Sequence, residues 1–210
     1  MDHGIVLHRT ELMPPTDSIG VTPAAALLQH AATTRRLDVI RIGDRLLATA
    51  AASSLELTEL AATQSWRPGA DSLRWCVPLM NPRSASVPET DCRVYLVAAG
   101  LPEPLTNVPV VDSPDSPIGD LWLPEFRLCI EHEGRHHFTD AAQVKRDVWR
   151  YSVMRDLGIA YAGASRDPAQ PTSLRDARSP GLGQTGIPRA HALVRASMER
   201  ALLPRPLTTL

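Results

Sequence analysis

Lysine is nearly absent from this chain of 210 residues. The sequence contains 22 basic side chains, and all of them except Lys145 are arginine. Such a bias usually reflects a GC-rich coding sequence, so it carries no functional meaning by itself. It does mean that any mechanism that requires a lysine has a single candidate.

Cysteines and long apolar segments are also few. The three cysteines, Cys76, Cys92 and Cys129, are odd in number and scattered, which is typical of reduced thiols in a cytosol. No apolar run approaches the roughly 20 residues that a membrane-spanning helix needs. The start, Met1–Gly4, lacks the basic and apolar regions of a signal peptide. We therefore expect a cytoplasmic protein without a membrane partner.

Charge is nearly balanced overall but unevenly distributed. Apolar residues make up 43% and charged residues 21% of the chain, which is typical of a globular protein, and the net charge of −1 excludes a uniformly basic protein that coats nucleic acid. Residues 85–134 carry 9 acidic and 2 basic side chains, whereas residues 135–200 carry 11 basic and 6 acidic ones. This arrangement would suit a metal site beside a phosphate-binding surface. Two solvated faces with no partner are the alternative.

The first third of the chain reads as helices with short strands. Thr22 and Pro23 have the cap and first-turn residues of a helix start, and helical patterns follow over residues 38–51 and 55–62. No group of catalytic residue types occurs there. A polar connector, Asn81–Ala85, then marks a domain boundary.

The region after the connector predicts an α/β fold with a mixed sheet flanked by helices. Ser86-x-x-Glu89 has the form of a capping box and begins a helix that ends at Gly100. Further elements are expected in the order strands over 108–111, 119–123 and 127–133, a helix over 139–157, a strand over 159–164, a loop over 167–188 and a helix over 189–202. In the 139–157 helix, the apolar side chains fall near one face: Val144, Val148, Tyr151 and Leu157.

Three carboxylates are expected to meet on one face of the sheet. Glu131 and Glu133 are two residues apart in a predicted strand, so they point to the same side, and Asp120 can join them if the preceding strand pairs through the turn at 124–126. Three carboxylates near apolar neighbours repel unless a cation lies among them, and Mg²⁺ prefers such oxygen ligands. The alternative is that Glu131 and Glu133 pair with arginines at the solvent face of an edge strand.

These residues and their spacing resemble the PD-(D/E)xK nuclease superfamily. The nearer resemblance is to the Vsr-like endonuclease domain of unknown function that occurs in many actinobacterial proteins. It covers about residues 84–165 and rests on the following residues: Ser86, Pro88, Glu89, Arg93, Gly100–Pro104, Asp120, Leu121, Pro124, Glu131, Glu133, Gly134, His136, His137, Thr139, Asp140, Gln143 and Asp147.

A weaker resemblance concerns the first third. Gly20–Pro23 and Ile42–Leu47 look like part of the AbiEi-antitoxin-like region that often precedes this domain. The resemblance implies three parts: an AbiEi-like, mostly helical region over 1–80, in which the usual winged helix is largely absent, an endonuclease-like core over 84–165, and a Pro/Gly/Arg-rich loop with a C-terminal helix over 166–210.

The superfamily resemblance implies roles for the acidic residues. Asp120 and Glu131 would bind Mg²⁺ or Mn²⁺ together with the backbone carbonyl of His132, and Glu89 would be an outer or second-metal carboxylate, although its place in the capping box explains it equally well. Glu133 stands where the superfamily usually has a lysine, and would orient or deprotonate the attacking water. Lys145 could supply the missing cation, but a solvated surface lysine is the favoured interpretation.

Histidines and arginines complete the candidate site. His136 or His137 would protonate the leaving oxygen or bind a phosphate. A zinc site built on Cys129, His132 and His136 is not favoured, because His132 should point away from the face that carries Cys129. Phosphate contacts are expected from the following basic residues: Arg135, Lys145, Arg146 and Arg150.

Two functions remain open from the sequence. The leading one is a Mg²⁺-dependent endonuclease-like phosphodiesterase that acts on DNA through an Asp/Glu-x-Glu acidic centre. The alternative is a non-catalytic regulatory or toxin–antitoxin-type protein that binds DNA or protein with a degenerate nuclease fold.

Overall fold

The structure is a computed structural model that describes residues 10–132 and 141–164. The chain divides into two compact units, Met1–Pro82 and Arg83–Leu210. The division falls inside the polar connector that the sequence marked as a boundary. Within the described ranges, no helix is both long and apolar enough to cross a bilayer.

The first unit is mostly helical, as predicted, but the expected short strands are absent from its described residues apart from an isolated bridge between Thr16 and Val21. Its helices are α1 (Pro23–His30), α2 (Arg36–Ala48), α3 (Ser54–Thr63) and α4 (Ala70–Cys76), followed by a 3₁₀ turn over Val77–Leu79. The Thr22 hydroxyl accepts a hydrogen bond from the amide of Ala25, and the Ser53 hydroxyl accepts one from the amide of Glu56. These caps explain where α1 and α3 begin, because they satisfy amides that have no partner in the first helical turn.

Gly69 allows α4 to begin directly against α1. Its φ is 93°, in the left-handed region, and a β-carbon there would overlap the carbonyl oxygen of Leu28 and lie 2.7 Å from the amide nitrogen of Ala32. Leu28 of α1 and Leu73 of α4 are almost completely buried where the two helices meet. The close approach of two backbones therefore requires glycine at this position.

The second unit is an α/β domain with a four-stranded mixed sheet. Its elements are α5 (Val87–Ala98), β1 (Leu105–Pro109), β2 (Ile118–Leu123), a 3₁₀ turn (Pro124–Phe126), β3 (Leu128–His132), α6 (Ala141–Asp156) and β4 (Ala160–Ala164). The strand order is β1-β2-β3-β4; the first two pairings are antiparallel, and β4 is parallel to β3. The α/β class and the mixed sheet are thus confirmed.

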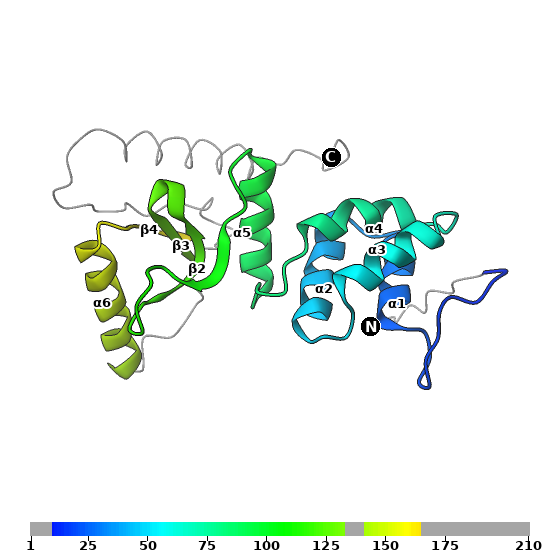
Figure 1. Ribbon diagram of the computed structural model, residues 1–210, viewed down its shortest axis with the longest axis horizontal. Helices are drawn as coiled ribbons and strands as arrows, with labels where there is room; N and C mark the ends of the chain where they lie inside the picture. Colours follow the sequence, from blue (N-terminus) through cyan, green and yellow to red (C-terminus); the bar gives the residue numbers. More distant parts are fainter. Residues whose placement is uncertain (1–9, 133–140, 165–210) are drawn as a thin grey trace, which may run out of the picture. The chain divides into compact units, whose positions relative to one another are not determined.

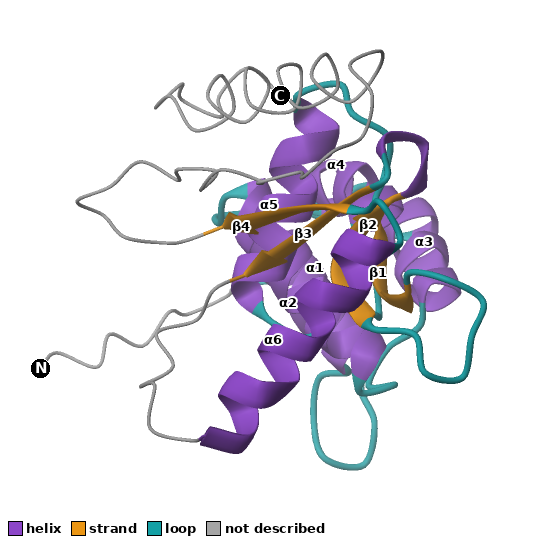
Figure 2. Cartoon of the chain, turned by 90° about the vertical axis from the view of Figure 1, so that its left-hand side faces the viewer, coloured by secondary structure: helices purple, strands orange, loops and turns teal. Residues whose placement is uncertain are grey.

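A helix covers each face of this sheet (Figure 1, Figure 2). On one face, Leu96 of α5 belongs to a buried cluster with Leu121, Leu123, Leu128, Ile130, Ala160 and Ala162. On the other face, Met154 of α6 belongs to a cluster with Val110, Trp122, Cys129 and Ile159. Successive residues of a strand point to opposite faces, so both faces of β2 and β3 are buried.

The first strand begins and ends earlier in the chain than the sequence predicted. The prediction placed the strand at 108–111, whereas β1 is Leu105–Pro109. Leu105 pairs with Trp122 and Thr106 with Leu121, on the next strand along the chain. Pairing across the sheet therefore overrides the local apolar pattern of residues 108–111.

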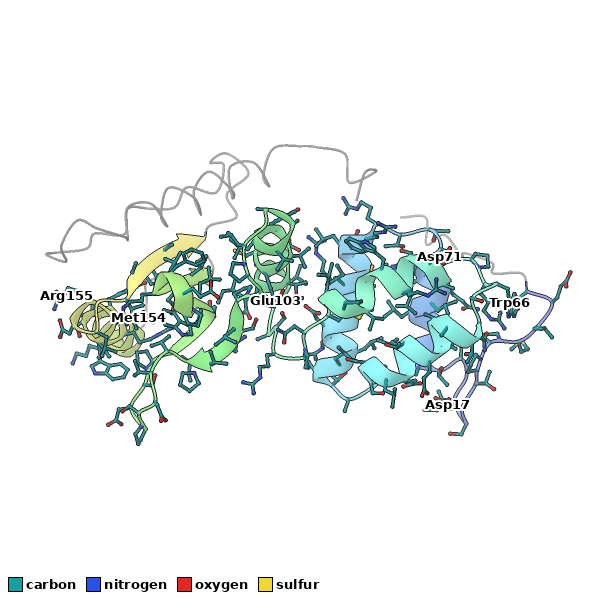
Figure 3. All side chains as sticks on the ribbon, turned by 45° about the horizontal axis from the view of Figure 1, so that its top comes forward. Asp17, Trp66, Asp71, Glu103, Met154 and Arg155 are labelled. Atoms are coloured by element: carbon teal, nitrogen blue, oxygen red, sulfur yellow. The ribbon has the colours of Figure 1, made fainter. Side chains whose placement is uncertain are left out.

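The predicted packing face of α6 was wrong. Val148 and Tyr151 are 61% and 41% exposed, whereas Met154 is 1% exposed. Met154 points toward the sheet and Arg155 points away from it (Figure 3). The face of α6 that packs on the sheet contains Arg150, one turn before Met154. A charged residue on this face interrupts the apolar periodicity from which a packing face is predicted.

Replacing Gly69 by alanine is expected to destabilise the first unit by about 3 kcal/mol, because the new methyl group overlaps backbone atoms and φ is positive. Urea unfolding would measure the loss. Gly20→Ala is the matched control, since no atom lies within 4 Å of a β-carbon there. Equal stability of the two variants would contradict the packing described for Gly69.

Candidate functional site

Two of the predicted acidic residues lie on neighbouring central strands. Leu121 pairs with Ile130 and Trp122 with Cys129 in the antiparallel ladder of β2 and β3. Asp120 and Glu131 are the next residues on their strands, directly beyond the Leu121–Ile130 pair. Glu131 is 9% exposed, and Asp120 is partly exposed. The sheet therefore brings these two carboxylates to adjacent positions.

The Cys129 thiol lies close to both acids. Its Sγ is 4.0 Å from Oε1 of Glu131, which confirms that Cys129 and Glu131 share a face of β3. Burial is the main cause that raises the pKa of Cys129, and the negative charges of Glu131 and Asp120 raise it further. Burial likewise raises the pKa of Cys92 on α5 to about 12, with contributions from Asp91 and Asp120. The carboxylate of Asp120 is thus within electrostatic range of thiols on both α5 and β3.

Arg150 is a cation that reaches this site. Its guanidinium donates a hydrogen bond to Oε1 of Glu131 and another, of 2.7 Å, to the carbonyl oxygen of Ile118 at the start of β2. The side chains of Arg150 and Glu131 are 28% and 11% exposed. Lys145, the other basic candidate on α6 whose side chain is described, is exposed. The sequence assigned Arg150 to phosphate contacts. Pairing of Glu131 with an arginine was the alternative, but it was expected at the solvent face of an edge strand, whereas β3 lies between β2 and β4 and Glu131 is buried.

Glu89 is held by groups of its own neighbourhood. Its carboxylate accepts hydrogen bonds from the amide of Ala85, the hydroxyl of Ser86 and the side-chain amide of Asn107, at 3.0, 2.7 and 2.8 Å. The Ser86 hydroxyl also accepts from the amide of Glu89, at 3.4 Å, so the predicted capping box is present. These bonds tie the start of α5 to the connector and to β1.

Arg93, another residue of the resemblance, is completely buried. Its guanidinium donates a hydrogen bond of 2.7 Å to the carboxylate of Glu103 and one of 3.3 Å to the hydroxyl of Ser84. A buried guanidinium needs such partners, because an unpaired charge away from water is costly. Arg93 therefore links α5 to the segments on either side of it, a role that its seven-residue spacing from Ser86 does not reveal.

Several predicted site residues cannot be placed. Glu133, Arg135, His136 and His137 lie outside the described residues. Among residues 10–132 and 141–164, no three His, Cys, Asp or Glu side chains are grouped so that they could hold a metal ion. Glu89 is accordingly not brought together with Asp120 and Glu131. The two carboxylates on β2 and β3 have the oxygen chemistry that Mg²⁺ prefers, but they do not form a complete ligand set alone.

The comparisons with known proteins identify distant relatives. Two proteins of Mycobacterium tuberculosis, "Uncharacterized protein Rv2248" of strain H37Rv and "Uncharacterized protein MT2308" of strain CDC 1551 / Oshkosh, are each 24% identical to this chain over 163 residues. The alignments cover 74% of this chain, which spans about three fifths (59%) of the length of these curated relatives. No family model matches the sequence. No solved structure matches it either.

Replacing Glu89 by glutamine is expected to lower the free energy of unfolding by about 2 kcal/mol, even with a chelator present. The glutamine side chain carries an NH₂ group in place of one carboxylate oxygen, and this NH₂ group would face hydrogen-bond donors that now bond to the carboxylate. Urea unfolding in EDTA would measure this. Glu125→Gln, in an exposed turn, is the control. A Glu89→Gln protein as stable as the control would contradict the bonding described above.

The cysteines are expected to resist alkylation by iodoacetamide at pH 8 in the folded protein. A raised pKa keeps the thiol neutral to higher pH, and only the thiolate reacts. Burial raises the pKa of Cys76 to about 11, and the thiols of Cys92 and Cys129 are also shifted upward. Mass spectrometry would follow the labelling, with urea-unfolded protein as the control in which all three react. Rapid labelling of Cys129 in the folded protein would contradict its surroundings as described.

Proposed function

We propose that this protein is a cytoplasmic, Mg²⁺-dependent endonuclease-like phosphodiesterase that acts on DNA, with a PD-(D/E)xK-type core. The observation that supports the proposal is the position of Asp120 and Glu131, side by side on the central strands of a mixed sheet with a helix on each face. The order of elements, from α5 through three strands and α6 to β4, agrees with the core that the sequence resemblance implies.

The chemistry of the two acids suits a hard divalent cation. Asp120 and Glu131 would hold the ion through their carboxylate oxygens, with the backbone carbonyl of His132 as a further ligand. Mg²⁺ bound there would supply charge stabilisation to the reacting phosphate and lower the pKa of a water molecule. Glu133 would accept the proton of the attacking water, and His136 or His137 would donate one to the leaving oxygen.

The basic residues would bind the DNA backbone. Lys145 on α6 is exposed, so it would be accessible to the phosphates of bound DNA. Arg146 and Arg135 are proposed to act with it. Arginine suits phosphate because its planar group donates two parallel hydrogen bonds. Contacts of this kind do not depend on base sequence, so the proposal includes no sequence specificity.

One observation favours a second function. The carboxylate of Glu131 is already neutralised within the chain by Arg150, as it would be in a fold that has lost its metal. A non-catalytic regulatory or toxin–antitoxin-type protein that binds DNA or protein, with an AbiEi-like helical first unit, would have this property. Calorimetric titration distinguishes the two functions, because DNA binding without uptake of Mg²⁺ or Mn²⁺ would support the second one.

Purified protein is expected to nick supercoiled plasmid or mismatched duplex DNA only when Mg²⁺ or Mn²⁺ is added. Asp120→Ala and Glu131→Gln should each lower the rate at least about 100-fold, because a metal carboxylate is removed. Asp112→Asn, which changes an exposed acid in a loop, is the matched control and should keep the full rate. Equal nicking by all four proteins would mean a contaminating nuclease and would refute the proposal.

A further inference from the structure

Arg150 lies where it touches both strands that carry the acids. The same terminal nitrogen, Nη2, donates to the carboxylate of Glu131 on β3 and to the carbonyl oxygen of Ile118 on β2. Ile118 is two residues before Asp120, so the guanidinium lies at the end of the ladder where both acids are found. Its positive charge therefore belongs to the acidic centre.

The surroundings of Glu131 make such a charge necessary. Cys129 and Trp122 on the same side of the sheet are buried with Met154, and Glu131 itself is 9% exposed. A carboxylate in such a place is stable only when a cation or several donors replace the lost water. Arg150 supplies this charge from within the chain.

A divalent cation at Glu131 would compete with Arg150. The guanidinium bonds Oε1, and two positive groups within a few ångströms of each other repel strongly where water is scarce. A cation can therefore use this oxygen fully only after Arg150 moves. Arg150 can do so because its side chain is 28% exposed and is long enough to turn toward solvent.

We propose that Arg150 is an internal counter-ion of Glu131, which a divalent cation must displace and which thereby weakens metal binding. The inference rests on the proposed function and adds a regulation of its site.

Arg155 is the matched control on the same helix. It points away from the sheet (Figure 3), is 56% exposed, and pairs with Asp156 at 3.2 Å. Arg155→Gln removes one positive charge from α6, as Arg150→Gln does, but leaves Glu131 with its counter-ion. Any effect of net charge alone should therefore be equal in the two variants.

Calorimetric titration of the full chain with Mn²⁺ tests the proposal. Arg150→Gln should bind Mn²⁺ about ten-fold more tightly than the unchanged protein, and Arg155→Gln should bind it with unchanged affinity. A purely structural role of Arg150 would weaken metal binding, so the direction of the change is decisive. If Arg150→Gln does not fold, Arg150→Lys takes its place. The ammonium group of lysine cannot donate two parallel hydrogen bonds to Glu131, so this variant should raise the affinity for Mn²⁺ by a smaller factor.

Equal or weaker Mn²⁺ binding by the Arg150 variants would overturn the counter-ion role and leave the proposed function intact, provided that Glu131→Gln loses both metal binding and cleavage. Mn²⁺ binding without cleavage of DNA by the unchanged protein would refute the nuclease and not the counter-ion. Absence of Mn²⁺ binding by every variant would overturn both.

Discussion

A buried carboxylate on a central strand of a sheet that is covered on both faces must be neutralised, and this constraint organises the second unit. Glu131 lies on β3 between the layers formed by α5 and α6. Arg150 meets the requirement from α6 and at the same time bonds the first residue of β2. One guanidinium thus fastens a helix to two strands, beside the apolar packing of Met154 on the same face of the sheet.

The charged residues at the start of α5 work in a different way. Glu89 accepts three hydrogen bonds and Arg93 pairs with Glu103, so both are occupied in holding α5, the connector and β1 together. Residues of one sequence pattern therefore divide into two groups. Those on α5 secure the framework, and those on β2 and β3 form the acidic centre that the framework positions.

Local signals in the sequence predicted much of this fold. The capping box gave the start of α5, and the Pro124–Phe126 turn gave the antiparallel pairing of β2 and β3, because both depend on residues close in the chain. The sequence left open that Glu131 pairs with an arginine but did not identify Arg150, and it missed the packing face of α6, because a charged residue on that face is acceptable only when its partner on another element is known. The same holds for β1, whose limits follow from its partner strand. For the two acids, the predicted pairing of the strands through the turn at 124–126 placed Asp120 beside Glu131, whereas Glu133, His136 and His137 lie beyond the described residues.

The parallel pairing of β3 with β4 has a consequence for how the chain folds. Parallel neighbours require a crossover, and here the crossover contains α6, so Glu131 and Arg150 are only 19 residues apart in sequence. Contacts between residues so close in the chain have a low cost in loop entropy and can form early. The buried acid and its counter-ion therefore come from one continuous β–α–β segment, and the charge need not remain uncompensated while the rest of the sheet assembles.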